Sequence, residues 1–264
     1  MNFITSQIDS QHTNIMAKLK SLIKIEGTLD GLTFYKGKDG YLVRTKGGVS
    51  KNRIQNDPAF IRTRENGTEF GHIAKSGKIL RQAITPLLAD VKDSRVSSRL
   101  TKAMGLVKNA DLSSARGQRQ VGVGITTTEG KNALQAFDFN NNAPLDSVLY
   151  AEYQVDTTTG EVSILNLTPS QDINAPGGAT HVSCIAGVLN LDFITEEKEL
   201  ILSPEANLPL NGTVTNINIT PATMPVGTGQ MYYFLKLAFY QEVNGTQYAL
   251  NNGAYNVLQI LDIV

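Results

Sequence analysis

Basic residues are the side chains of this chain best placed to do chemistry, because they recur at helical intervals on two nearby segments. The first stripe consists of Lys75, Lys78 and Arg81, and the second of Arg95, Arg99 and Lys102. Residues three or four positions apart lie on one side of a helix, and an array of cations there binds phosphates or other anions. A solvated helix face normally mixes cations with acids, whereas Asp90 and Asp93 are the only acids between residues 71 and 108. Two readings stay open, a solvated face and a binding surface.

The charge of the whole chain is sorted into two halves. Residues 1–120 carry 21 of the 24 Lys and Arg and 10 of the 24 Asp and Glu, a net charge of +11, and residues 121–264 carry the balancing −11. A strongly basic half attracts an acidic partner, which is either nucleic acid or the acidic half of a second copy. Docking of the two halves within one molecule would neutralise the same charges.

Three acids gather at Glu196, Glu197 and Glu199, between the apolar runs 193–195 and 200–202. This placement predicts a turn between two strands, read either as a solvated turn or as an acidic contact patch. A catalytic carboxylate pair of the glycosidase kind needs a cleft lined with aromatic side chains, and the chain has no Trp.

The sequence contains no pattern of a catalytic, metal or cofactor site. Cys184 is the only cysteine and lies in an apolar run, which excludes an internal disulfide and a cysteine zinc site and predicts a buried side chain. The three histidines, His12, His72 and His181, belong to different segments and lack the spacing of metal ligands. A nucleophile elbow is also absent. We therefore expect a protein without enzymatic activity.

The N-terminal part predicts a β-hairpin followed by helices. Runs 31–35 and 41–45 are β-prone and flank an Asp-Gly pair at 39–40 that favours a hairpin turn, and 24–27 reads as a further edge strand. Asp57-Pro58 marks a helix start. Apolar residues at helical spacing continue to Pro86, with an expected break at Asn66-Gly67 and a new cap at Thr68, and a second helix fits residues 94–108.

The C-terminal part predicts strands separated by turns. A short helix fits 128–137, and the expected strands are 147–155, 161–167, 180–189, 199–202, 213–220, 231–242 and 255–264. The odd step between the apolar residues of 213–220 predicts a β-bulge near Asn216. About seven strands at this spacing are typical of an antiparallel immunoglobulin-like β-sandwich. The predicted fold class is α+β, with a hairpin and basic helices before the sandwich.

The chain is expected to divide into three parts: a flexible arm over 1–20, a hairpin and basic helical region over 21–115, and the β-sandwich over 116–264. Gly117, Gly122 and Gly124 lack the spacing of a phosphate-binding loop and predict a flexible linker. The polar segment before Met16 reads either as an arm or as an extension ahead of the true start. No apolar run is long enough for a signal peptide or a membrane span, which predicts a cytoplasmic chain when synthesised, with release or export of assemblies left open.

The stretch 26–35, together with Val43-Arg44, Gly47-Gly48 and Asn56-Asp57-Pro58, resembles a family of uncharacterised Bacteroidota proteins. The resemblance implies a glycine-rich hairpin, an Asn-Asp-Pro start to a basic helix and a β-rich C-terminal half. It implies no activity, cofactor or catalytic residue.

The leading hypothesis is a structural protein that self-assembles as a homo-oligomer, head to tail, into a filament, tube or ring. The basic N-terminal half of one copy would contact the acidic C-terminal half of the next. The aromatic run 231–240 is expected to contribute part of its surface to such a contact. The alternatives are a nucleic-acid-associated protein that binds through the basic helices, and a ligand-binding or adhesive β-sandwich that uses loops such as 169–178.

Overall fold

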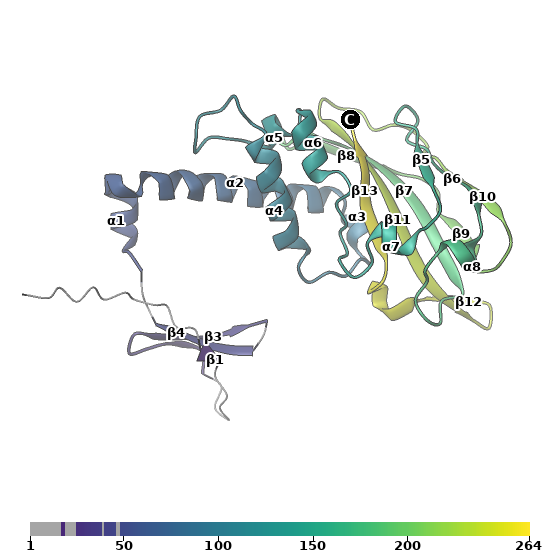
Figure 1. Ribbon diagram of the computed structural model, residues 1–264, viewed down its shortest axis with the longest axis horizontal. Coiled ribbons are helices and arrows are strands. Elements are labelled where there is room, and N and C mark those ends of the chain that lie inside the picture. Colours follow the sequence, from purple (N-terminus) through teal and green to yellow (C-terminus); the bar gives the residue numbers. More distant parts are fainter. Residues whose placement is uncertain (1–16, 19–24, 39, 46–47) are drawn as a thin grey trace, which may run out of the picture. The chain divides into compact units, whose positions relative to one another are not determined.

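The computed structural model describes residues 17–18, 25–38, 40–45 and 48–264 of the chain, and comprises two compact units, Met1–Ile61 and Arg62–Val264 (Figure 1). The arm expected over 1–20 lies, apart from residues 17–18, outside the described part. The sequence predicts a boundary near 115, whereas the helices after Arg62 belong to the same compact unit as the strands. The reason is a shared hydrophobic core, in which Leu80 and Leu100 pack with Leu189 and Ile260.

The N-terminal unit is built on a small antiparallel sheet with the strand order β1-β4-β3-β2. Its strands are β1 (Ala17–Lys18), β2 (Gly27–Leu29), β3 (Leu32–Gly37) and β4 (Gly40–Thr45). The predicted hairpin is present, because β3 and β4 pair in antiparallel fashion as far as Gly37 and Gly40. Helix α1 (Lys51–Asn56), which is not among the helices expected from the sequence, precedes the single turn η1 (Pro58–Phe60). The Asp57 carboxylate caps that turn by accepting from Ala59 N at 2.9 Å, as expected for a helix start.

Helix α2 (Ile61–Ala83) runs without interruption through Asn66 and Gly67, so the predicted break there is wrong. Thr68 does not cap a new helix, because its hydroxyl donates to the Arg64 carbonyl of the same helix at 3.0 Å. A glycine within a helix costs only about 1 kcal/mol, and the burial of Ile73, Leu80 and the residues around them offsets that cost. The next helices are α3 (Thr85–Leu88), α4 (Val96–Asn109), α5 (Val121–Gly124) and α6 (Thr128–Leu134).

The larger sheet of the second unit is centred on two long antiparallel strands, β7 (His181–Leu191) and β11 (Gln230–Val243). The outer edge of β11 pairs with β13 (Val257–Ile263) and with β12 (Thr246–Ala249). The outer edge of β7 pairs with β8 (Lys198–Leu202) and with β9 (Ala206–Pro209). The second sheet has the order β10-β6-β5, with strands β10 (Thr215–Ile219), β6 (Val162–Leu167) and β5 (Tyr153–Val155). The short helices α7 (Leu145–Val148) and α8 (Pro169–Asp172) and the single turn η2 (Leu250–Gly253) complete the unit.

The pairing of the strands tests two predictions for the C-terminal region. A register shift between Thr215 and Ile217 confirms the bulge near Asn216. The strand expected over 147–155 is wrong in its first half, where the chain forms α7 and then a bridge between Leu149 and Ile173.

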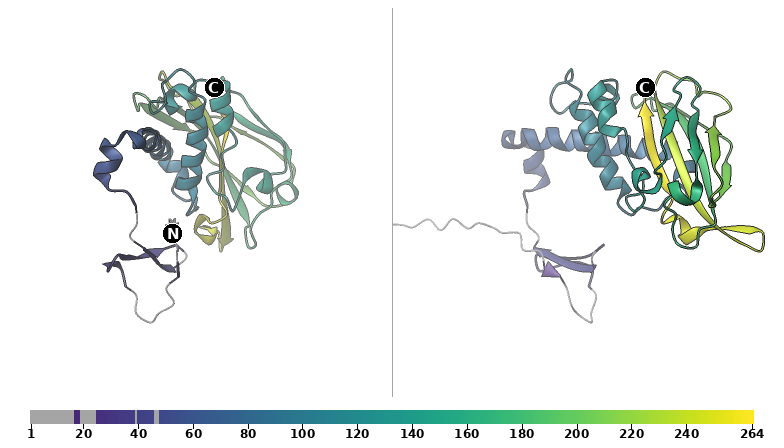
Figure 2. Two further views of the ribbon diagram at one scale, coloured as in Figure 1. Left: turned by 60° about the vertical axis from the view of Figure 1, so that its left-hand side comes forward. Right: turned by 45° about the vertical axis from the view of Figure 1, so that its right-hand side comes forward.

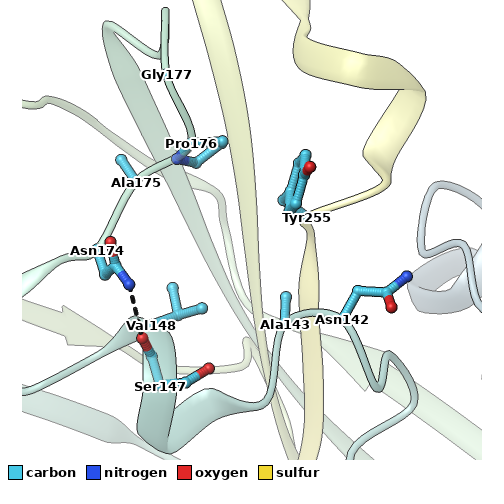
Figure 3. A pocket seen from close by; sticks show the side chains of 9 residues that line it. All are labelled: Asn142, Ala143, Ser147, Val148, Asn174, Ala175, Pro176, Gly177 and Tyr255. Atoms are coloured by element: carbon cyan, nitrogen blue, oxygen red, sulfur yellow. Dashed lines mark hydrogen bonds between the residues drawn. The ribbon is translucent and has the colours of Figure 1, made fainter.

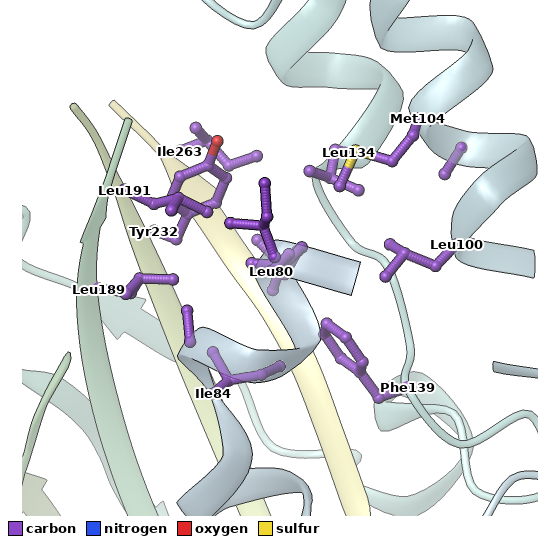
Figure 4. Close-up of a cluster of buried hydrophobic side chains, with 14 of the residues drawn as sticks. Leu80, Ile84, Leu100, Met104, Leu134, Phe139, Leu189, Leu191, Tyr232 and Ile263 are labelled. Carbon is purple, nitrogen blue, oxygen red and sulfur yellow. The ribbon is translucent and has the colours of Figure 1, made fainter. Parts of the chain in front are cut away.

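The second unit has three layers, with helices on one face of the larger sheet and the small sheet on the other (Figures 1 and 2). Tyr232 of β11 packs in the core toward the helices (Figure 4), and Phe234 belongs to the same core. Tyr233, Leu235 and Leu237 pack in the core toward the small sheet. The side chains of the aromatic run 231–240 are therefore buried on both faces of the larger sheet within one chain. This differs from the expectation that part of the run contacts a neighbour. The fold is mixed, with antiparallel sheets, and the immunoglobulin-like topology is not confirmed.

Candidate interaction surfaces

The basic stripe on α2 meets the acidic turn within one chain. Lys75 forms an ion pair with Glu196, which lies in the turn between β7 and β8 and has a positive φ of 65°. Glu199, on β8, accepts a hydrogen bond from Val226 N at 2.6 Å, and Glu197 is exposed. The structure thus brings one member of the predicted basic set and one of the predicted acidic set into direct contact.

The other cations of the two stripes fall into two groups. Arg99 is held in the fold, since it pairs with Asp93 at 2.6 Å, donates to the Asp138 carbonyl at 2.8 Å and lies over the Phe137 ring. Arg81 donates to the Gly77 carbonyl of its own helix at 3.3 Å. The remaining members are exposed and form no ion pair with the part of the chain that the structure describes: Lys78, Arg95 and Lys102.

A buried ionic cluster joins α2 to α4 and to the segment that follows α4, and the expectations from the sequence do not include it. Glu69 accepts from Lys108 Nζ at 2.6 Å, from Arg119 Nε at 2.8 Å and from Gly117 N at 2.8 Å. The bonds from Arg119 and Lys108 lower the pKa of Glu69 to about 2. The available signal is spacing, because Glu69 shares a helix face with the buried residues Ile73, four positions on, and Leu80.

The segment 115–124 is packed rather than a flexible linker. The buried Asp111 carboxylate accepts from Ser114 N and Gln120 N, each at 2.9 Å, and closes the loop before α5. Gly124 needs the absence of a side chain, because a Cβ there would overlap the Val107 carbonyl of α4. Gly124, one of the glycines predicted to loosen the chain, therefore allows α4 and α5 to approach closely.

The sheet of the N-terminal unit has an apolar face that the described residues of this unit leave partly exposed. Leu29, Leu32, Phe34 and Val43 share that face, because Leu29 pairs with Leu32 and Phe34 with Val43 in the register of β2, β3 and β4. Leu29 is 61% exposed and Leu32 is 38% exposed. Among the described residues of the unit, none is buried.

The opposite face of the same sheet is more polar. Thr28 and Thr33 pair across β2 and β3, and their hydroxyls lie 3.2 Å apart. Arg44 lies over the Tyr35 ring on this side, 5.5 Å from its centre. The two faces differ as expected for a sheet that packs on one side only.

A pocket of about 380 Å³ lies between α7 and the segments 174–177 and 142–143 (Figure 3). Its apolar surface comes from Ala143, Val148 and Pro176 together with the Tyr255 ring, and the amides of Asn142 and Asn174 lie at its sides. None of its nine lining residues carries a charge.

Cys184 is buried as expected, and burial raises the pKa of its thiol to about 12. Within the described ranges, no group of three or more His, Cys, Asp or Glu residues could hold a metal ion. Among the helices of that same part, none has the length and apolar composition to cross a membrane. The chain matches no known family model, no curated protein and no solved structure.

Proposed function

We propose that this protein is a non-enzymatic structural protein that assembles head to tail with further copies of itself into a filament, tube or ring. The basic N-terminal half of one copy contacts the acidic C-terminal half of the next. A heterologous contact of this kind closes into a ring or continues as a filament, depending on its rotation. The observation that carries the proposal is the apolar face formed by Leu29, Leu32, Phe34 and Val43, on which the described residues leave Leu29 and Leu32 exposed and Phe34 and Val43 half-buried.

A small sheet needs a second layer to be stable in water. Full burial of a Leu, Phe or Val side chain stabilises by roughly 1.5–3 kcal/mol, so covering this face would contribute several times that amount. The described residues of the N-terminal unit do not provide the cover. A second protein surface that packs on this apolar face would therefore stabilise the complex of the two.

Charge complementarity selects a second copy as that partner. Residues 1–120, which contain the N-terminal sheet and both basic stripes, carry a net charge of +11, and residues 121–264 carry a net charge of −11. Opposite net charges favour encounter between the basic half of one copy and the acidic half of another. Two acids of the predicted acidic patch, Glu197 and Glu199, and three exposed cations of the basic half, Lys78, Arg95 and Lys102, are the charges we assign to this contact.

The proposal is tested by sedimentation velocity and negative-stain microscopy on the full chain, freed of nucleic acid, at low and high salt. Regular assemblies at low salt that dissociate as salt rises are expected, because salt screens exposed charges beyond about 10 Å at 0.1 M. A monomer at every salt and protein concentration would show that the halves dock within one molecule and would reject the proposal.

A nucleic-acid-associated protein is the second candidate, favoured by the exposed Lys78, Arg95 and Lys102. Its binding would fall steeply with salt, and reversal of Lys75, Lys78 and Arg81 to Glu would abolish it. The third candidate is a ligand-binding or adhesive sandwich of immunoglobulin-like type, which the uncharged pocket favours.

A further inference from the structure

We infer that the pocket between α7 and Tyr255 binds a neutral saccharide unit. The pocket belongs to the unit Arg62–Val264 and uses no residue of the N-terminal sheet, so the inference is independent of self-assembly. Its volume of about 380 Å³ lies within the range of small-molecule sites.

One wall of the pocket is fixed by a buried amide. Asn140 is fully buried, and its side chain donates to the carbonyls of Ala254 and Asn256, each at 2.9 Å. The same side chain accepts from Asn142 N at 3.0 Å. The segments that carry Asn142 and Tyr255 are therefore tied to one another before any ligand binds.

The opposite wall is fixed by α7. Asn174 donates through its backbone to the Val148 carbonyl at 2.8 Å and through its side chain to the Ser147 carbonyl at 3.1 Å (Figure 3). The side-chain oxygen of Asn174 can therefore accept a hydrogen bond from a ligand in the pocket. Binding then requires little ordering of either wall, which reduces its entropic cost.

The lining selects an uncharged ligand with both apolar and hydroxyl surface. A charged group would lose water without gaining a partner of opposite charge here, which is costly. The Tyr255 ring, with the Pro176 ring across the pocket, offers flat apolar surface for the C–H face of a sugar (Figure 3). The Asn142 amide forms no hydrogen bond through its side chain to any described residue and can pair with ring hydroxyls.

The test is saturation-transfer difference NMR on the full chain with three probes, N-acetylglucosamine, methyl α-mannoside and methyl β-galactoside. Transfer to at least one sugar is expected, unchanged by salt because no charge is involved. Tyr255→Ala should abolish it, and Asn142→Ala should weaken apparent affinity roughly threefold to tenfold, as loss of one hydrogen bond does.

Two matched controls keep the outcome clear. Tyr248→Ala removes a ring that is also exposed, and Asn141→Ala removes the neighbouring amide, and neither residue lines the pocket. Both variants should bind like the wild type. Absence of transfer to all three sugars, or transfer that Tyr255→Ala and Asn142→Ala leave unchanged, would overturn the inference.

Discussion

Lys75 on α2 and Glu196 in the turn between β7 and β8 form an ion pair within one chain. Both side chains are largely in solvent, 62% and 45% exposed, so water and salt weaken the pair. One contact between the basic and acidic halves is therefore already made inside each copy. The contact that we propose between copies would therefore depend on the remaining charges and on the apolar face of the N-terminal sheet.

Separate substitution of Lys75 and Lys78 should distinguish the ion pair within one copy from the proposed contact between copies. Lys75→Gln is expected to leave the midpoint of thermal unfolding unchanged within about 2 °C, because an exposed pair contributes little, and to leave assembly unchanged because Lys75 already has a partner. Lys78→Gln removes the same charge one turn away and should reduce assembly at low salt, measured by sedimentation velocity. Equal effects of the two variants on assembly would count against the assignment of Lys78.

Acid should destabilise the second unit through Glu69. Its pKa is about 2 in the folded protein against an ordinary value of 4.5, so the unfolded chain takes up its proton first as pH falls. The stabilisation is present above pH 4.5 and is lost between about pH 4.5 and 2. Urea unfolding of the wild type over this range should show the loss.

Glu69→Gln should cost about 3–5 kcal/mol at pH 7, because it leaves Lys108 buried without its partner. The control is Glu65→Gln on the same helix, where Glu65 pairs with the half-exposed Arg116, and there a loss of less than about 1 kcal/mol is expected. Losses of the same size in both variants would show that Glu69 is not the centre of a buried cluster.

Lys236 and Asp90 should respond unequally to removal of their charges. Lys236 points from the core strand β11 and is nearly buried, whereas the Asp90 side chain is 40% exposed. Lys236→Met should be neutral or stabilising by about 1 kcal/mol, because Asp90 can be hydrated, and Asp90→Asn should cost about 3 kcal/mol, because it leaves a buried ammonium. Urea titrations give both values, and the reverse order would contradict this account of the pair.

The sequence predicts those elements that local chemistry determines. The Asp57-Pro58 cap, the hairpin around Gly37 and Gly40 and the bulge near Asn216 depend on neighbouring residues, and the structure has all three. The break at Asn66-Gly67 and the glycine linker after residue 115 fail because packing against distant residues overrides local propensity.

The Glu69 cluster and the pocket could not be predicted from the sequence for the same reason. The Glu69 cluster joins residues about 40 to 50 positions apart, and the pocket joins α7 to Tyr255. The spacing of residues along the sequence does not predict contacts between such distant segments. The pairing of Lys75 with Glu196 also required the fold, although the opposite charges of the two regions were evident beforehand.

Self-assembly through the apolar face of the N-terminal sheet is tested most directly by two substitutions on β2. Leu29 and Thr28 are adjacent, both exposed and on opposite faces of the sheet, so Leu29→Asp and Thr28→Asp introduce the same charge on different sides. Sedimentation velocity at low salt should show that Leu29→Asp reduces the wild-type assembly to monomer while Thr28→Asp still assembles. Assembly of Leu29→Asp to the wild-type extent would contradict the account.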